Sequence, residues 1–249
     1  MMTRAVTGCA MLWCALAHAQ GGPPMVTDDP GTPGNGHWEI NLAWVGEHGG
    51  GATTQDLPLL DMNYGLGERI QLKYEVPWLL VEDAAAATRA GLGDSLAGVK
   101  WRFYDSGDPH RWQISTYPQY EFNSVSHSYQ RGIVEQGAHW DLPLEFQKNF
   151  GSVDFNYEVG RTLRTQGTAE DVWFGGMVVG RQMTPRLETM LELQGTFARS
   201  FDRNGVILNG GFRYKLGGPF TLLGAAGSGI AGSDRPSWIG YLGLQFASE

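Results

Sequence analysis

The stretch IQLKYEVPW at residues 70–78 alternates between apolar and polar side chains. Side chains of a β-strand point to opposite faces in turn, so this stretch predicts a strand with one apolar and one polar face. A helix would place Pro77 in its interior and Lys73 beside Val76, which breaks both the hydrogen bonding and the amphipathic face. Such strands fit two architectures: a soluble sheet with a dry core, or a membrane barrel with lipid outside and water inside.

The same two-residue period recurs from residue 38 almost to the end of the chain. It predicts about twelve strands, at residues 38–44, 57–66, 70–78, 97–103, 112–122, 139–146, 153–159, 172–182, 187–197, 206–215, 220–226 and 238–246. The faces of the eighth strand are ambiguous, and the eleventh is weak and precedes a glycine loop at residues 227–229. Residues 81–93 and 123–136 are expected to form long connections.

Strand number and loop lengths favour the membrane barrel. Bacterial outer-membrane barrels have an even number of antiparallel strands, short periplasmic turns and longer outer loops. In this chain the connections after even-numbered strands are mostly tight, and those after odd-numbered strands tend to be longer. A soluble sandwich has no reason to follow such a rule.

Many charged side chains occupy the polar parity of these strands. In a dry core each would cost several kcal/mol unless it were paired, whereas a water-filled lumen removes that penalty. The residues expected to face the lumen are Lys73, Glu75, Lys100, Arg102, Glu121, Asp141, Glu145, Asp154, Glu158, Glu188, Glu192, Arg213 and Lys215. For any single one of them, pairing across the lumen is the simple alternative to a role in selecting a solute.

The tryptophans separate the two architectures further. Membrane interfaces hold tryptophan at the two rims of the apolar band, whereas a sandwich core would bury it in mid-strand. All eight tryptophans that follow Trp13 are expected near strand ends. A periplasmic rim would contain Trp38, Trp101 and Trp112, and an outer rim would contain Trp44, Trp78, Trp140, Trp173 and Trp238.

These patterns together predict an all-β fold, a closed antiparallel up-and-down transmembrane β-barrel of about 12 strands over residues 37–249. Closure pairs every backbone N–H and C=O group, which is the only way in which a sheet survives in hydrocarbon. The expected partners are outer-membrane lipid, a small-molecule solute and the machinery that assembles outer-membrane proteins.

The first 19 residues have the features of an export signal: a basic residue, a short apolar stretch and the cleavage motif AHA at residues 17–19. Both cysteines lie in this segment, so the mature chain is expected to have no disulfide and no thiolate metal site. Residues 20–36 are rich in Gly, Pro and Asp and are expected to form an irregular leader. The leader would either hang in the periplasm or enter the barrel opening.

Composition agrees with an outer-membrane location. The 249 residues have a mean hydropathy of −0.26, and no uninterrupted apolar run after the export signal reaches the about 18 residues of an ordinary transmembrane helix. The 36 glycines disfavour a helical fold and suit tight turns. A net charge of −8 offers no basic footprint for nucleic acid. No metal or cofactor motif is recognisable, so neither is expected.

Three blocks of sequence resemble the outer-membrane protein family that is named for the meta-pathway of phenol degradation. They are TDDPGTPG at 27–34 with HWEIN at 37–41, DMNYGLG at 61–67 with LKYEVPW at 72–78, and GLGD at 91–94 with GVKWRF at 98–103. Beyond residue 103 the likeness is only that of barrels in general. The resemblance implies a protein that helps aromatic or other small hydrophobic compounds cross the outer membrane, with no catalytic residue to carry over.

Three functions remain open. The first is a passive channel or uptake protein for small solutes, aromatic or hydrophobic ones among them, whose flux would depend on lumen residues such as Lys73 or Arg102. The second is a barrel without a transport role that serves in structure or surface interaction. The third is a lipid hydrolase using Ser126 or His127. Neither Ser126-His127-Ser128 nor His139 has an acidic or amide partner by spacing, so no enzyme is expected.

Overall fold

The computed structural model describes residues 22–83, 86–107, 111–165 and 170–248, so the expected export signal at residues 1–19 lies outside the described part. The elements of this part are β1 (Trp38–Gly49), β2 (Ala52–Leu66), β3 (Ile70–Asp83), β4 (Arg89–Leu92), β5 (Ser95–Asp105), β6 (Trp112–Thr116), β7 (Gln119–Phe122), α1 (Ser126–Gln130), β8 (Ala138–Phe150), β9 (Val153–Arg164), β10 (Val172–Thr184), β11 (Leu187–Ala198), β12 (Asn204–Gly217), β13 (Phe220–Gly232) and β14 (Trp238–Ala247).

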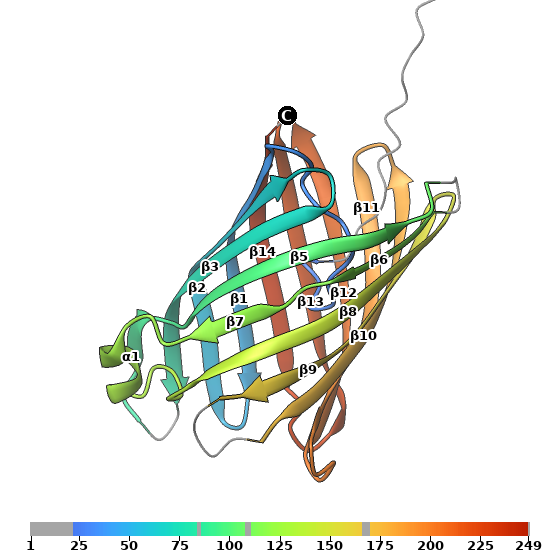
Figure 1. Cartoon of the computed structure of the whole chain (residues 1–249). Helices are drawn as coiled ribbons and strands as arrows, with labels where there is room; N and C mark the ends of the chain where they lie inside the picture. The colour runs from blue at the N-terminus through green and yellow to red at the C-terminus, as the bar shows by residue number, and fades with distance from the viewer. Residues whose placement is uncertain (1–21, 84–85, 108–110, 166–169, 249) are drawn as a thin grey trace, which may run out of the picture.

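The strands form one closed antiparallel barrel (Figure 1). Closure comes from β1, which pairs with β2 on one side and with β14 on the other. Both β4 and β5 pair with β3, and both β6 and β7 lie between β5 and β8. Each of these two pairs fills one place in the wall, so the fourteen described segments make a twelve-stranded barrel, and the predicted fold class is confirmed.

The predicted fifth strand is interrupted at Tyr117 and Pro118. Proline has no N–H to donate to the ladder, so the pairing breaks there and resumes at β7. The carbonyl of Pro118 still accepts a hydrogen bond from the N–H of Val99 at 3.0 Å, and the Tyr117 side chain is fully buried inside the barrel. The predicted connection at residues 81–93 is shorter than expected, because β3 continues to Asp83 and β4 pairs with it from Arg89 to Leu92.

One end of the barrel has tight turns at residues 67–69, 151–152, 185–186 and 218–219, and we call it the turn end. The opposite, loop end has the connections 50–51, 84–88, 123–137, 165–171, 199–203 and 233–237. The predicted alternation fails at the first connection, where Gly50 and Gly51 make a two-residue turn with φ of 59° and 85°. Glycine reaches these left-handed angles without strain, so β1 and β2 extend to the turn.

The two strands that the pattern predicted least clearly are both present and complete. The ambiguous eighth strand is the regular β10, and the weak eleventh is β13, which continues through residues 227–229 instead of ending in a glycine loop. The polar connection at residues 123–137 contains the one-turn helix α1. Glycine-rich strands carry few apolar side chains, so their period is faint in sequence although their backbone pairs normally.

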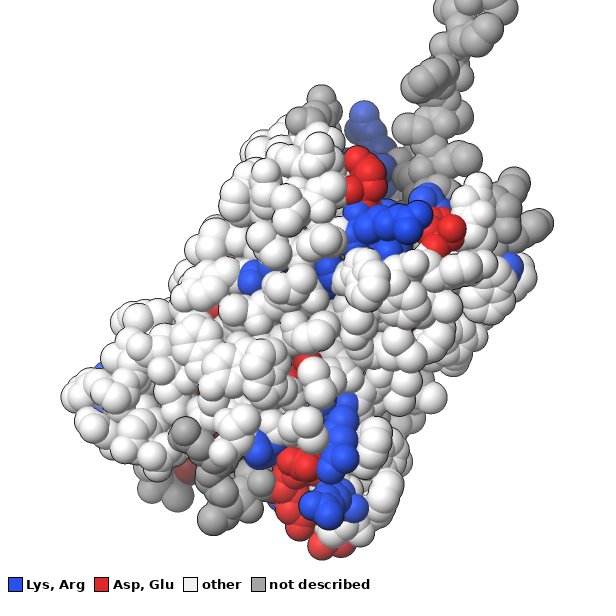
Figure 2. Space-filling model, viewed as in Figure 1, with Lys and Arg blue, Asp and Glu red and all other residues white. Residues whose placement is uncertain are grey.

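The two faces of the wall differ as strongly as the alternation predicts. Along β3, Leu72 is 41%, Tyr74 42% and Trp78 48% exposed, whereas Gln71 is 8% exposed. Figure 2 shows one side of the barrel, where uncharged residues cover most of the middle and charged residues gather toward the two ends. The apolar parity therefore covers the outside and the polar parity lines the inside.

Candidate functional site: the lumen and its leader

The leader, described here for residues 22–36, lies inside the barrel (Figure 1). Met25 is 5%, Thr27 0% and Asp29 4% exposed, although none of them belongs to a strand. The sequence left open whether the leader hangs in the periplasm or enters the barrel, and in the structure it lies inside the barrel. Lumen side chains therefore have a protein segment as their neighbour as well as one another.

Two carboxylates of the wall bind the leader backbone. The N–H of Thr27 donates to Oε1 of Glu192 at 2.5 Å, and the N–H of Val26 donates to Oε2 at 3.2 Å. The N–H of Asp28 donates to Oε2 of Glu158 at 3.3 Å. Buried carboxylates are tolerated only when hydrogen bonds replace their lost hydration, and the leader supplies these bonds.

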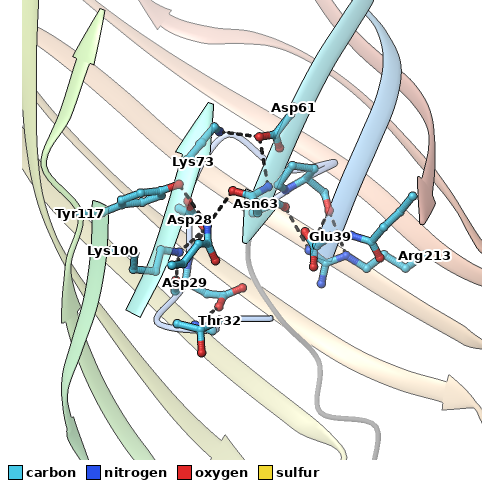
Figure 3. Close-up of a pocket in the computed structure, with 15 residues that line it drawn as sticks. Asp28, Asp29, Thr32, Glu39, Asp61, Asn63, Lys73, Lys100, Tyr117 and Arg213 are labelled. Carbon is cyan, nitrogen blue, oxygen red and sulfur yellow. Dashed lines mark hydrogen bonds and ion pairs between the residues drawn. The ribbon is translucent and has the colours of Figure 1, made fainter. Parts of the chain in front are cut away.

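Two cations of the wall also hold this segment (Figure 3). Nζ of Lys100 is 3.0 Å from Oδ1 of Asp28 and also donates to the carbonyl of Asp29. The guanidinium of Arg213 donates twice to the carbonyl of Pro23, at 2.9 and 2.7 Å. Burial raises the pKa of Asp28, but the ammonium groups of Lys100 and Lys73 and the hydrogen bonds from Lys100 and from the N–H of Asp29 together hold this pKa below its ordinary value.

Close packing adds to these polar contacts. Met25 packs with Val178 and Met190 in a small apolar cluster inside the barrel. Gly176 faces Thr27 so closely that a Cβ on the glycine would collide with the threonine hydroxyl. The missing side chain at this position leaves the space that the leader fills.

The remaining lumen polar groups form short networks. Nζ of Lys73 lies 2.9 Å from Glu75 and 3.5 Å from Asp61, and the amide of Asn41 donates to Asp61 at 3.0 Å. At the loop end, Nε2 of His139 lies 3.6 Å from Glu121 and 3.4 Å from Asp141. Pairing of this kind lets the lumen hold many charges beside a narrow water space.

The expected lumen residues fall into three groups. Around the leader and its ion pairs are Lys73, Glu75, Lys100, Glu145, Glu158, Glu192 and Arg213. Toward the loop end are Glu121 and Asp141. Toward the turn end are Arg102, whose Nε lies 3.7 Å from Asp105, the buried Asp154 and Glu188, and the exposed Lys215.

The expected rim tryptophans all lie on the outer parity of their strands. Trp38, Trp101 and Trp112 are exposed near the turn end. Nearer the loop end are Trp44, Trp78, Trp140, Trp173 and Trp238. The expectation that each is near a strand end is wrong for Trp44 and Trp78, because β1 and β3 continue five residues further. Trp44 stacks on Trp238 with 6.3 Å between ring centroids.

The leader lies between two spaces of unequal size. Toward the turn end is a pocket of about 50 Å³, lined by leader residues together with Asn63, Lys73, Lys100 and Tyr117 (Figure 3). Toward the loop end is a cavity of about 490 Å³, which extends from the leader to Pro236 in the last loop. We call the second space the outer cavity. The larger of these two spaces is therefore the one toward the loop end.

Several residues of this site were not among the expected ones. Asp28, Asp29 and Thr27 were assigned to the leader without a contact, because a Gly- and Pro-rich segment has no period from which to infer one. Asn209 and Tyr117 are uncharged and were not among the candidate lumen residues, although Asn209 has the inward parity of β12 and Tyr117 continues the inward parity of β6. The parity signal alone was sufficient to find these two.

The candidate hydrolase residues Ser126 and His127 lie in α1. Ser126 begins α1, which lies within the expected loop, and Ser128 is 6% exposed. In the described part of the chain, no serine hydroxyl is hydrogen-bonded to a histidine. His139 lies near two carboxylates, those of Glu121 and Asp141. Spacing in sequence did not indicate Glu121, because this residue lies on the paired strand β7.

None of the described helices is both long and apolar enough to pass through a membrane. Among the same residues, no group of three or more His, Cys, Asp or Glu side chains is placed to hold a metal ion.

No protein-family model matches the sequence, and no curated protein matches it significantly. An outer membrane channel from Pseudomonas putida F1 superposes with a TM-score of 0.69 at 13% identity, over 88% of this chain and 98% of that one. The KdgM porin gives 0.60 at 10% identity, over 85% and 99% of the two chains. This chain has an outer-membrane β-barrel fold.

A third outer-membrane barrel agrees. The translocator domain of the autotransporter NalP from Neisseria meningitidis gives a TM-score of 0.52 at 11% identity, over 86% of this chain and 88% of that one. At such identities the likeness concerns the fold alone. The resemblance to the phenol meta-pathway family rests on the sequence motifs, since no family model adds to it.

Proposed function

We propose that this barrel is a passive outer-membrane channel for small solutes, which reaches the membrane after an export signal has been cleaved after Ala19. The observation that carries the proposal is a polar lumen inside an apolar wall, with a cavity of about 490 Å³ toward the loop end. A lumen of this kind has its polar groups where water and solute meet them. The solved channel and porin of the same fold support the proposal.

The leader restricts this channel. The pocket on its turn-end side holds only about 50 Å³, so a solute that takes this route passes only if the leader shifts or if the solute is very small. A twelve-stranded barrel is also narrower than the 16–18-stranded porins and is partly filled by its own side chains. We therefore propose slow, selective conduction, with small aromatic or hydrophobic compounds as the solute class implied by the sequence resemblance.

Single-channel conductance in planar bilayers tests this proposal. The full mature chain is expected to conduct weakly, and a chain that lacks residues 22–36 is expected to conduct several times more, because deletion empties the lumen. The heat-dependent shift on gels shows whether the shortened barrel still folds. Equal conductance of the two folded proteins contradicts a restricting leader, and no conductance from either contradicts a channel and favours the structural alternative.

Swelling of liposomes tests the solute class. Sugars, amino acids and phenolics are compared with the full chain, with Lys73→Met and with Arg102→Met. We expect phenolics to enter faster than sugars of similar size, and the lumen variants to change these rates. Equal entry of all solutes, unaffected by either substitution, contradicts selection by the lumen.

A further inference from the structure

The outer cavity has an apolar wall. The leader contributes Pro24 and Met25, and the strands contribute Leu59, Ile207 and Ile239. At about 490 Å³, the cavity is within the range of about 300–1,000 Å³ that holds small molecules. Apolar surface inside a watery lumen gains free energy when a ligand covers it.

Two polar groups in this wall have no hydrogen-bond partner among the described residues. Asn209 is 2% exposed, and its Nδ2 donates to Glu192 at 2.9 Å, which leaves its Oδ1 without a donor. The hydroxyl of Tyr241 is likewise buried and unpartnered. A buried acceptor without a donor is costly. The oxygen has almost no accessible surface, so the Asn209 side chain must turn toward the cavity before Oδ1 can receive an N–H from a ligand.

The charges around the outer cavity are mostly negative. Among the described residues that line it, the carboxylates are Asp28, Glu47, Glu75, Glu158 and Asp234, and the one ammonium is Lys73. Glu47 and Asp234 are exposed near the loop end and form no ion pair within the described residues. Unpaired carboxylates at the mouth of a low-dielectric space attract cations and repel anions.

We propose that the outer cavity binds small organic cations with an apolar body, of the arylalkylammonium kind. The apolar wall covers the body, Oδ1 of Asn209 accepts an N–H, and the carboxylates of Glu47 and Asp234 draw the ammonium in. A neutral phenolic loses the electrostatic part of this attraction, and an aromatic anion is repelled. As a statement about which solutes the channel takes, this inference rests on the proposed function.

Calorimetric titration of the purified full chain in detergent tests the site directly. The probes are 2-phenylethylammonium, the neutral 2-phenylethanol and the anion phenylacetate. We expect saturable binding of the ammonium alone, weakening as salt is added because the charges at the mouth are screened. Binding of all three probes with equal affinity, or of none, overturns the proposal.

Two double variants test whether Glu47 and Asp234 are the carboxylates that attract the ammonium. Glu47→Gln with Asp234→Asn is expected to raise the Kd for the ammonium about three- to tenfold, the effect of two partly screened carboxylates. Glu82→Gln with Asp202→Asn changes the net charge equally at two exposed positions outside the cavity lining and is expected to leave the Kd unchanged. Equal effects of the two pairs overturn the site.

Failure of the site and failure of the channel give different results. Entry of both ammonium and alcohol into liposomes at equal rates, without saturable ammonium binding, rejects the cation site and retains the channel. Saturable ammonium binding without any entry retains the site and rejects conduction.

Discussion

Lys100 shows how one side chain joins the barrel wall to the leader. Its Nζ lies 3.0 Å from Asp28 in the leader and 3.5 Å from Glu145 in β8, and the residue is 2% exposed. Alternation in sequence predicted the inward direction of Lys100 and Glu145. It did not predict Asp28 as their partner, because the contact depends on where an aperiodic segment settles inside the closed barrel.

Replacement of this lysine tests the importance of the contact. Lys100→Met leaves two carboxylates without their cation in a buried site, which costs about 3–5 kcal/mol of unfolding free energy. The matched control is Lys215→Met, since Lys215 is exposed and has no ion pair in the described part of the chain. Unfolding in urea from lipid vesicles measures both variants, and a loss no greater for Lys100→Met than for the control contradicts this role.

Strand β10 shows what an element contributes beyond its pairing. Its alternation was too faint to assign a face, because the glycines at 175 and 176 carry no side chain. In the barrel Gly176 faces the leader and leaves room for Thr27. The interruption between β6 and β7 was equally hidden, since the pattern on both sides of Pro118 keeps the same parity. The role of such a glycine or proline can be assigned only when the segment that packs against it is known.

A side chain at this glycine is expected to displace the leader. Gly176→Val places carbon where the Thr27 hydroxyl lies, and the paired strand yields less readily than the irregular leader. Hydrogen exchange followed by mass spectrometry is expected to show faster exchange over residues 22–36, because the N–H of Thr27 loses Glu192.

Gly210→Ala is the matched control for this variant. Gly210 is exposed, and an added Cβ would meet only a backbone oxygen at 4.0 Å. Exchange over the leader is therefore expected to match that of the unchanged protein. A leader that stays protected in Gly176→Val would mean that it is not packed against β10.

At the scale of the whole molecule, the fold followed from one rule: apolar positions outside, polar positions inside. That rule predicted the closed barrel and the inward parity, because both depend on a period that every strand repeats. It could not place the leader or locate the outer cavity, since these depend on segments without a period. The sequence therefore predicts the wall of the proposed channel, whereas the contents of its lumen are known only from the structure.

The most direct test of the rule is a nitroxide scan of residues 70–76, one cysteine at a time, with the folded chain in liposomes. At Leu72, Tyr74 and Val76, we expect the label to meet dissolved oxygen more than a water-soluble nickel complex, because these positions face lipid. At Gln71, Lys73 and Glu75, the oxygen contact should fall, so the signal should alternate with a period of two. Uniform access to the nickel complex along the whole stretch, or the opposite phase, would contradict the account.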